Sequence, residues 1–411
     1  MTLDPQAIRS QFPALTSGLV YFDNPGGTQV PNRVIDRMVD YLVTKNANHE
    51  GAFPTSQRSD ALVDQAHRVM AEMLNATPDE IVFGANMTTL TLHLSRSIAR
   101  ELQPGDEIIV TRLDHDANIS PWMHVAEDRG CTLRWLDFDV EDCTLRLADL
   151  ESLLSKRTRL VAVGYASNAV GTINPVERII ELAHQAGAWC VVDAVQYAPH
   201  GAIDVRRLDC DFLVVSAYKF FGPHAGVLFG KRDLLERLFP YKVRPAPEAP
   251  PGKFETGTGN FEAIAGTLGA VEYLASLGPQ TGEATGSLRD PLGLAMESIQ
   301  DHERHLSRVL INSLQSLPGV RIHGITDPGA IHQRVPTVSF TVAGLHPRNI
   351  AAALGEQGVQ VWDGNYYAPA VTERLGLEAD GGMVRVGLVH YNTVDEIQRL
   401  VDTLRPLLGR S

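Results

Sequence analysis

Short apolar segments alternate with helical patterns from about residue 60 to about residue 235. Apolar runs of about four to eight residues are typical of strands buried in a sheet, and a helical pattern over 176–186 separates two of them. Strands that alternate with helices predict right-handed crossovers and a mostly parallel sheet, which is an α/β fold. The expected strands include 107–110, 160–163, 189–192 and the run 212–219.

Two of these segments end on ionisable side chains. Asp193 follows the run 189–192, and Lys219 ends the run 212–219. Parallel sheets bind ligands at the carboxyl ends of their strands, so we expect both side chains at one ligand-binding edge. The pair suits pyridoxal 5'-phosphate (PLP), because a lysine amine bonds to its aldehyde while a carboxylate keeps its pyridine nitrogen protonated. The alternative is a buried ion pair between Asp193 and Lys219.

The charge balance is acidic. The chain has 411 residues, with 36 Lys and Arg against 49 Asp and Glu and a net charge of −13. This balance argues against nucleic acid or an anionic membrane surface as the main partner. No apolar run approaches the roughly 18 residues that span a bilayer, and the chain does not begin with a basic and apolar leader. We therefore expect a cytoplasmic protein.

The cysteines are few and scattered. They fit neither a disulfide framework nor the paired spacing of a zinc site, and we expect no metal. Two of them, Cys190 and Cys210, lie in apolar strand contexts, where we expect them in the core. The four cysteines are Cys131, Cys143, Cys190 and Cys210.

Two segments interrupt the regular patterns. The proline-rich stretch 244–252 cannot continue a helix or a central strand, which predicts an exposed loop beside the site. The glycine-rich and threonine-rich segment 278–287 marks a domain boundary. We predict a large PLP-binding domain over 20–285 and a small α+β domain formed by 1–19 and 286–411. The small domain is expected to contain helices at 292–317 and 394–408 and strands at 337–342 and 383–388.

Seven short motifs occur along the chain in a fixed order. Through them the chain resembles the class V aminotransferases, in the cysteine desulfurase-like branch of the fold-type I PLP enzymes, from about residue 21 to about residue 404. The resemblance implies PLP as the cofactor and a large domain with a mostly parallel seven-stranded sheet. The motifs are 21–27 (YFDNPGG), 114–119 (DHDANI), 167–172 (SNAVGT), 193–196 (DAVQ), 216–219 (SAYK), 254–258 (FETGT) and Arg385 with 391–393 (YNT).

The resemblance assigns further cofactor contacts. His115 is expected to stack on the pyridine ring and to move protons at the substrate carbons. Gln196 corresponds to a residue that binds the phenolic oxygen, and Asn168 approaches that oxygen and the substrate carboxylate. Without the motifs, His115 would be a structural hydrogen-bonding residue, and Gln196 and Asn168 would be ordinary turn residues.

A phosphate needs backbone N–H groups at a helix start and hydroxyl groups. Asn86 is a candidate helix cap, followed by Met87 and Thr88 as phosphate-binding residues and by an amphipathic helix that we expect to begin near Leu90. Without the family context, this segment is only a good helix cap.

Two more hydroxyl residues are assigned to the phosphate by the resemblance. Ser216 is expected to bind it directly, and Thr258 corresponds to a residue that reaches the phosphate of a neighbouring subunit. A shared site implies a homodimer. The alternative for Thr258 is a glycine-rich turn with an incidental hydroxyl.

Arg385 lies in the alternating segment 383–388, where an inward arginine needs an anionic partner. The resemblance makes it the clamp for a substrate α-carboxylate, so we expect a small amino acid as substrate. The alternative is a structural salt bridge. Asn24 and Tyr218 are also expected to contact the substrate.

Several residues depart from the desulfurase pattern. Desulfurases of this branch take up sulfur on a cysteine in a mobile loop, but the equivalent segment 362–369 contains no cysteine. Tyr367 cannot form a persulfide, whereas C–S bond cleavage does not need that cysteine. Tyr218 stands where desulfurases usually have histidine, and His224 and the segment 24–27 (NPGG) are expected to reshape the pocket.

The sequence therefore predicts a homodimeric PLP enzyme that acts on a small amino acid by β-elimination, including C–S cleavage of a cysteine derivative. The substrate amine would displace Lys219, the freed lysine would remove the α-proton, and Asp193 would keep the ring cationic. Three alternatives stay open. They are transamination as in a class V aminotransferase, a cysteine desulfurase with a relocated sulfur acceptor, and a non-catalytic PLP-binding regulator.

Overall fold

The computed structural model describes residues 3–278 and 287–408. Among these residues the largest sheet has seven strands, in the order β2 (Ile81–Gly84), β8 (Gly226–Gly230), β7 (Phe212–Ser216), β6 (Trp189–Asp193), β5 (Thr158–Gly164), β3 (Glu107–Thr111) and β4 (Thr132–Leu136). The strands from β7 to β4 are parallel, whereas β8 is antiparallel to both β7 and β2. The predicted α/β fold with a mostly parallel seven-stranded sheet is confirmed.

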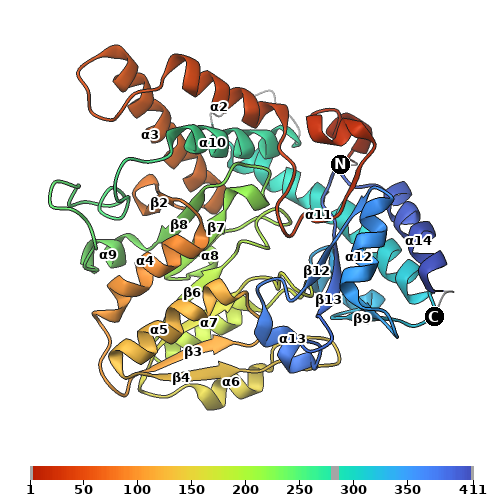
Figure 1. Ribbon diagram of the computed structural model, residues 1–411. Coiled ribbons are helices and arrows are strands. Elements are labelled where there is room, and N and C mark those ends of the chain that lie inside the picture. Colours follow the sequence, from red (N-terminus) through yellow and green to blue (C-terminus); the bar gives the residue numbers. More distant parts are fainter. Residues whose placement is uncertain (1–2, 279–286, 409–411) are drawn as a thin grey trace.

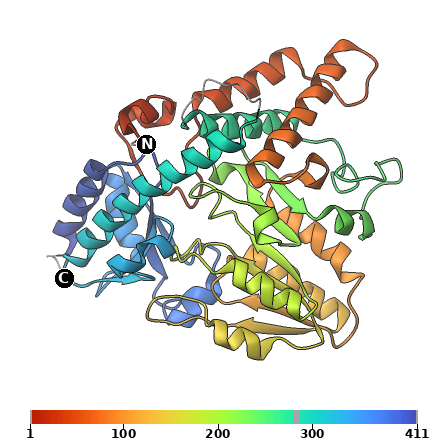
Figure 2. The same ribbon diagram turned by 180° about the vertical axis from the view of Figure 1, so that it is seen from behind.

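Helices cover both faces of this sheet (Figures 1 and 2). Successive side chains of a strand point to opposite faces, so Leu160 and Ala162 of β5 join one core while Val161 and Val163 join the other. This double burial explains why the strands are continuous apolar runs in the sequence. The first core includes α4 (Met87–Ala99) and α5 (Ser120–Arg129), and the second includes α3 (Pro54–Leu74), α7 (Val176–Gln185) and α10 (Phe261–Ser276), against which α2 (Asn32–Thr44) packs.

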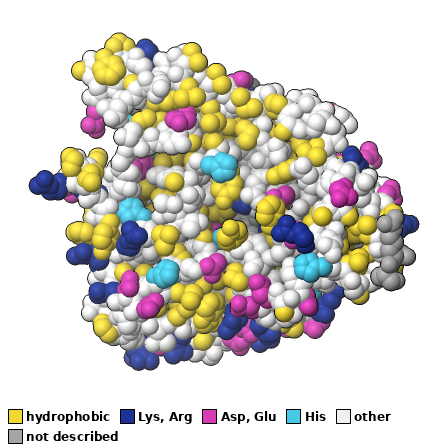
Figure 3. Space-filling view, in the orientation of Figure 1, with side chains coloured by type: hydrophobic (Ala, Val, Ile, Leu, Met, Phe, Trp, Pro, Cys, Tyr) yellow, Lys and Arg dark blue, Asp and Glu magenta, His cyan; other side chains and the backbone are white. Residues whose placement is uncertain are grey.

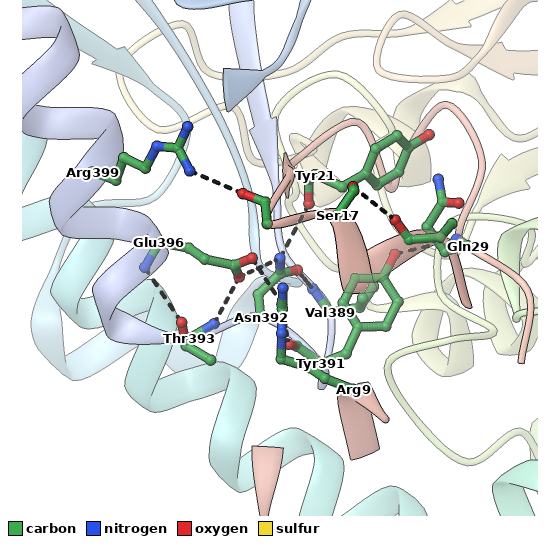
Figure 4. A network of polar contacts seen from close by, with 12 residues as sticks. Arg9, Ser17, Tyr21, Gln29, Val389, Tyr391, Asn392, Thr393, Glu396 and Arg399 are labelled. Atoms are coloured by element: carbon green, nitrogen blue, oxygen red, sulfur yellow. Dashed lines mark hydrogen bonds and ion pairs between the residues drawn. The ribbon is translucent and has the colours of Figure 1, made fainter. Parts of the chain in front are cut away.

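A four-stranded antiparallel sheet forms a separate layer with its own core. The N-terminal helix α1 (Pro5–Arg9) contacts both parts. Arg9 donates to the Tyr391 carbonyl (3.1 Å) and pairs with Glu396 (2.7 Å; Figure 4), whereas Ile8 packs in the core beside the large sheet. The strand order is β12 (Trp362–Gly364), β13 (Met383–Gly387), β10 (Thr337–Val342) and β9 (Val320–His323). The helices of this core are α11 (Arg289–Gln315), α12 (Pro347–Glu356) and α14 (Val394–Leu408).

Shorter elements complete the fold. They are the parallel pair β1 (Val20–Tyr21) and β11 (Val359–Gln360), the helices α6 (Leu147–Leu153), α8 (Val205–Leu208), α9 (Arg232–Arg237) and α13 (Pro369–Leu375), and the 3-10 turns Pro13–Ser17, Pro78–Glu80, Asp116–Asn118, Ala217–Lys219 and Pro328–Gln333. No helix of residues 3–278 and 287–408 combines the length and the apolar character that a membrane span needs. The cytoplasmic location stays a prediction.

The run 212–219 is a strand only over its first part. β7 ends at Ser216, because the N–H groups of Phe220 and Gly222 both donate to the Ala217 carbonyl (2.9 and 2.8 Å) and turn the chain. Lys219 therefore lies one turn beyond the carboxyl end of the strand rather than on it.

Two other local predictions need correction. α4 begins at Met87 rather than near Leu90, because the Asn86 side chain caps the helix by accepting from the N–H of Thr89 (2.9 Å). Cys210 lies in the connection between α8 and β7 rather than in a strand, although it is buried as predicted.

The predicted domain boundary between residues 285 and 286, with most of the segment 278–287, lies outside the described residues. The division into two domains therefore stays a prediction. The long helix that was expected at 292–317 begins earlier, at Arg289, and ends at Gln315. The proline-rich stretch 244–252 contains neither helix nor strand, as predicted.

Candidate active site

Asp193 is the last residue of β6, and it is buried at the carboxyl edge of the parallel strands. The N–H of Val195 donates to its Oδ1 (2.9 Å). Burial raises the pKa of Asp193 to about 7, even though this hydrogen bond favours the charged form. A cation placed against this carboxyl group would shift it to the ionised form, and the protonated ring nitrogen of PLP is such a cation.

Lys219 is half-buried. In the described part of the chain, which includes both residues, its amine forms no ion pair with Asp193. Its amine instead donates to the backbone carbonyls of Pro25 and Gly26, the latter at 3.0 Å. Burial and the nearby charge of Arg385 lower the pKa of Lys219 to about 7. Such an amine is largely unprotonated above neutral pH, as a nucleophile must be. This geometry disfavours the interpretation of the pair as a structural ion pair.

The start of α4 lies beside the end of β7. The N–H of Met87 donates to the Ser216 hydroxyl (3.0 Å), which brings two predicted phosphate-binding residues together. Thr88 is exposed in the first helical turn. The backbones approach closely here, since a Cβ at Gly226 would overlap the backbone of Asn86. A helix N-terminus flanked by hydroxyl groups suits a phosphate, although Ser216 takes the N–H of Met87 in this structure.

His115 precedes the turn Asp116–Asn118, which follows β3. Its Nδ1 accepts from the N–H of Ala117 (3.0 Å), so the proton of the neutral ring is on Nε2. Burial, together with the charge of Lys219, lowers the pKa of His115 to about 4. The ring stacks on Tyr367, with centroids 5.8 Å apart and planes at 18°. His115 thus offers a flat, uncharged ring near Lys219.

Asn168 and Gln196 lie just beyond β5 and β6. Asn168 donates from Nδ2 to the Tyr366 carbonyl (2.8 Å), whereas its buried Oδ1 has no partner among the described residues. Gln196 donates to the Thr337 hydroxyl (3.1 Å). A buried acceptor without a protein partner is expected to bind a ligand or a water molecule, so Asn168 can receive a donor from a bound group.

Arg385 lies in the middle of β13 with its guanidinium buried. It donates from Nη2 to Asp23 Oδ1 (3.1 Å) and from Nη1 to the Asn168 carbonyl (3.1 Å), and it lies 4.4 Å from the centre of the Tyr366 ring. The anionic partner that we expected for this arginine is therefore a residue of the protein itself, Asp23. From the sequence, Asp23 is one residue of the motif 21–27, and nothing there predicts its role as the partner of Arg385.

Asn24 is held by the protein on both sides of its amide. Its Nδ2 donates to the Gly387 carbonyl (2.7 Å) and to Asn392 Oδ1 (3.1 Å), and its Oδ1 accepts from the Tyr391 hydroxyl. Asn392 in turn links to Glu396 (3.0 Å; Figure 4). These contacts connect the motif 21–27 to the end of β13, and a substrate contact of Asn24 stays a prediction.

Tyr218 lies beside Lys219, whereas Thr258 lies in a loop between the proline-rich stretch and α10. The amine of Lys219 is 5.0 Å from the Tyr218 ring, which stacks on His224 with centroids 5.1 Å apart. Thr258 is exposed in its loop. That loop is anchored near β2, because Glu255 accepts from the N–H of Phe83 (2.7 Å).

Similarity to known proteins also indicates a PLP-binding protein. The family model of the class V aminotransferases matches residues 20–400. The chain belongs to this family. It is 36% identical to the aminotransferase-like protein FGM3 of Gibberella zeae, over 98% of each protein. It is 34% identical to a probable cysteine desulfurase of Mycolicibacterium paratuberculosis, over 98% of this chain and 58% of that longer protein.

A solved structure indicates the same family. The apo structure of a cysteine desulfurase from Thermococcus onnurineus NA1 superposes with a TM-score of 0.89 and 28% identity, over the whole of both chains. The predicted membership in the cysteine desulfurase-like branch is confirmed. Class V aminotransferases are PLP-dependent enzymes, and the protein is one of them. Its residues fit the cofactor, since an amine of low pKa, a buried carboxyl group and a helix N-terminus occur at one edge of the sheet.

The segment 362–369 lies against this edge. Tyr367 is 75% exposed, and its carbonyl accepts from the N–H of Asp116 (2.7 Å) next to His115. The four cysteines lie elsewhere. Three are buried, and the fourth, Cys131, is partly exposed just before β4, at the amino edge of the parallel strands and thus opposite Asp193.

Proposed function

We propose that the protein is a lyase that removes the β-substituent of a small amino acid, with C–S cleavage of a cysteine derivative as the best-supported case. The observation that carries the proposal is the segment 362–369. It lies against His115 yet presents Tyr367, which cannot accept sulfur, where desulfurases carry a cysteine. The residues that would handle the α-proton and the ring charge, Lys219 and Asp193, are nevertheless present.

The environment of each site residue suits one step of this reaction. PLP, when bound, supplies an electron sink for the electrons of the substrate Cα–H bond. Lys219 would hold the cofactor by its aldehyde, and its amine, once displaced, would take the proton from Cα. Asp193 would keep the ring nitrogen protonated, and the neutral His115 would pack on the ring. Arg385 would bind the substrate carboxylate.

The product set distinguishes this lyase from its alternatives. We expect holoenzyme incubated with cysteine and its S-conjugates to release a keto acid, ammonia and sulfide or a small thiol. A transaminase would instead yield an oxo acid without ammonia and leave the amino form of the cofactor. A panel of amino acids that yields no product at all would support a non-catalytic regulator and overturn the proposal.

The fate of sulfur tests the missing cysteine directly. We expect intact-mass measurement after turnover without reductant to show no added sulfur on the protein. The most accessible cysteine is Cys131, and burial raises the pKa of its thiol, which keeps it protonated and weakly nucleophilic. An added sulfur that maps to one cysteine, and is lost with activity when that cysteine becomes serine, would instead establish a desulfurase with a relocated acceptor.

Arg385→Ala is expected to raise the KM for amino acids by roughly 100-fold, the effect of removing one partner of a buried charge pair, while the visible absorbance of the cofactor changes little. Steady-state kinetics and the absorbance spectrum measure the two effects. Arg385→Lys is the matched control, because it keeps the charge but loses the bidentate geometry, and its KM should be intermediate. Equal loss of cofactor and substrate binding would indicate a structural arginine.

We also propose a homodimer with shared sites. The outer side of α2 presents apolar side chains, and an exposed apolar group of this kind on a surface helix is typical of an interface. Thr258 is exposed in its loop, so its hydroxyl is accessible to a neighbouring subunit. The exposed apolar residues of α2 are Ile35, Val39, Leu42 and Val43.

A further inference from the structure

Arg385 already holds a carboxylate in the proposed substrate site. Its Nη2 donates to Asp23 Oδ1 and its Nη1 to the carbonyl of Asn168, both at 3.1 Å. Its Nε is buried and has no hydrogen-bond partner in the described part of the chain. A guanidinium has five N–H donors, so a second carboxylate can reach the terminal nitrogens beside these partners, but it then lies next to the charge of Asp23.

Asp23 is the partner that an incoming carboxylate would replace. The Asn168 carbonyl is neutral, and its residue is fixed by the hydrogen bond from Nδ2 to the Tyr366 carbonyl (2.8 Å). Asp23 carries the same charge as the incoming group, and two carboxylates on one guanidinium repel each other. Its side chain also retains 17% of its exposure, against 4% for Arg385, so Asp23 is the less confined member of the pair.

The chain after Asp23 folds back over its carboxylate. The N–H groups of Gly26 and Gly27 donate to the Asp23 carbonyl (2.9 and 3.1 Å). A Cβ at Gly26 would overlap the carboxylate, so only glycine permits this close approach. The carbonyls of Pro25 and Gly26 accept from the amine of Lys219. One turn therefore places Asp23 near both the amine and the guanidinium of Arg385.

We propose that Asp23 is a positioning residue that occupies Arg385 until the substrate carboxylate displaces it, and that then stabilises the ammonium form of Lys219. This inference rests on the proposed role of Arg385 as the carboxylate receptor. When Lys219 takes the α-proton its amine becomes cationic, and the charge of Asp23 already favours that form. When the substrate binds, the carboxylate of Asp23 thus changes its partner from the guanidinium of Arg385 to the amine of Lys219, which is the general base.

Propionate tests the exchange in the holoenzyme, because it carries the carboxylate without an amino group. Asp23→Asn keeps the shape of the side chain and an acceptor for Arg385 but removes the competing charge. We expect calorimetric titration to show propionate binding roughly tenfold tighter in this variant, the effect of one charge-assisted hydrogen bond. The matched control is Asp142→Asn, which removes the same charge from an exposed carboxylate that accepts from the Thr144 hydroxyl (2.7 Å), and its propionate affinity should equal that of the unmodified enzyme.

The kinetics of Asp23→Asn should show opposite effects on the two constants. KM for the amino acid should fall, because the competitor is gone, while kcat should also fall, because the ammonium of Lys219 loses its partner. A structural role would instead raise KM and lower the cofactor content. Propionate affinity in Asp23→Asn that is equal to or weaker than in the unmodified enzyme would overturn the inference.

Arg385→Ala distinguishes a wrong substrate site from a wrong role for Asp23. If it binds propionate as tightly as the unmodified enzyme, Arg385 is not the receptor, and the proposed substrate site fails along with the inference. If it loses propionate while Asp23→Asn gains nothing, only the inference about Asp23 fails. A crystal structure of the unmodified holoenzyme with propionate needs no variant. Separation of Asp23 from Arg385 beyond the ~4 Å limit of an ion pair supports the exchange, and a retained pair overturns it.

Discussion

Replacement of Lys219 by alanine is expected to remove the visible absorbance band that borohydride fixes in the holoenzyme and to reduce turnover by about 10⁴-fold. The amine lies one turn beyond β7, within hydrogen-bonding distance of the carbonyls of the turn 23–27, and has a pKa of about 7. It is therefore both the group that can bond to the cofactor's aldehyde and the base for the α-proton. Absorbance before and after borohydride, with peptide mapping of the fixed cofactor, measures the first effect.

The lowered pKa of Lys219 adds a pH dependence. Below about pH 7 the amine is mostly protonated and cannot attack an aldehyde, whereas above about pH 7 it is mostly free. The rate at which apoprotein captures PLP is thus expected to rise through pH 7 and then level off. In Arg385→Ala the midpoint should move upward, because the charge of Arg385 lowers this pKa.

Lys45→Ala is the control for both measurements. It removes an amine that pairs with Asp40 at the end of α2, and it should keep the absorbance band and the pH midpoint. A cofactor that borohydride still fixes to the protein in Lys219→Ala would show that another amine carries it.

The sheet and its two ionisable residues can be predicted from the sequence because the pattern is local. Strands of a parallel sheet covered on both faces must be apolar at every position, so a charged residue at the end of such a run stands out. Asp193 is found at the end of its strand for this reason. The position of Lys219 is less predictable, since the Ala217 carbonyl ends the strand by accepting two N–H groups, and backbone hydrogen bonds leave no mark on residue type.

The partner of Arg385 cannot be predicted in the same way. Asp23 reaches it because the chain at Asp23 makes a parallel bridge to Gly387, two residues beyond Arg385. The two residues are far apart in the sequence, and no periodicity links them. The demand for an anion was predictable from an arginine in a buried strand, but the identity of the anion depended on this long-range pairing.

The shape of the segment 362–369 is also set by tertiary contacts. Tyr366 and Tyr367 both have positive φ, 59° and 57°, a conformation that tyrosine rarely adopts. The Tyr366 hydroxyl donates to the Met383 carbonyl, and the Tyr367 carbonyl accepts from the N–H of Asp116 (2.7 Å). These hydrogen bonds hold the segment against His115. The sequence of the segment shows that it has no cysteine but does not predict this position.

Asp193→Asn is expected to have opposite effects on catalysis and on the stability of the apoprotein. Turnover should fall by roughly 10³-fold, as when other preorganised charges are removed from an active site, because a neutral side chain no longer favours the protonated ring nitrogen. The phosphate end should still retain much of the cofactor. Turnover per bound cofactor, taken from kinetics and absorbance, measures this effect, and near-normal turnover in a folded variant would refute the role of Asp193.

The stability of the apoprotein should rise in the same variant. Burial raises the pKa of Asp193 from 3.8 to about 7, so the folded state binds more protons than the unfolded state between these values, and the carboxyl group destabilises the fold increasingly as the pH rises. Above pH 7 the penalty reaches roughly 4 kcal/mol, and it vanishes below about pH 3, where both states are protonated. Asparagine can still accept from Val195 and carries no charge, so the calorimetric Tm of the apo variant should exceed that of the unmodified protein at pH 8 and match it at about pH 3. Asp211→Asn is the contrasting control. Its buried carboxylate accepts from the N–H of Cys190 (2.7 Å) and pairs with His184 (2.8 Å), so the same substitution there should lower the Tm. A lower Tm for both variants at pH 8 would mean that the fold, and not only the cofactor, needs the charge on Asp193.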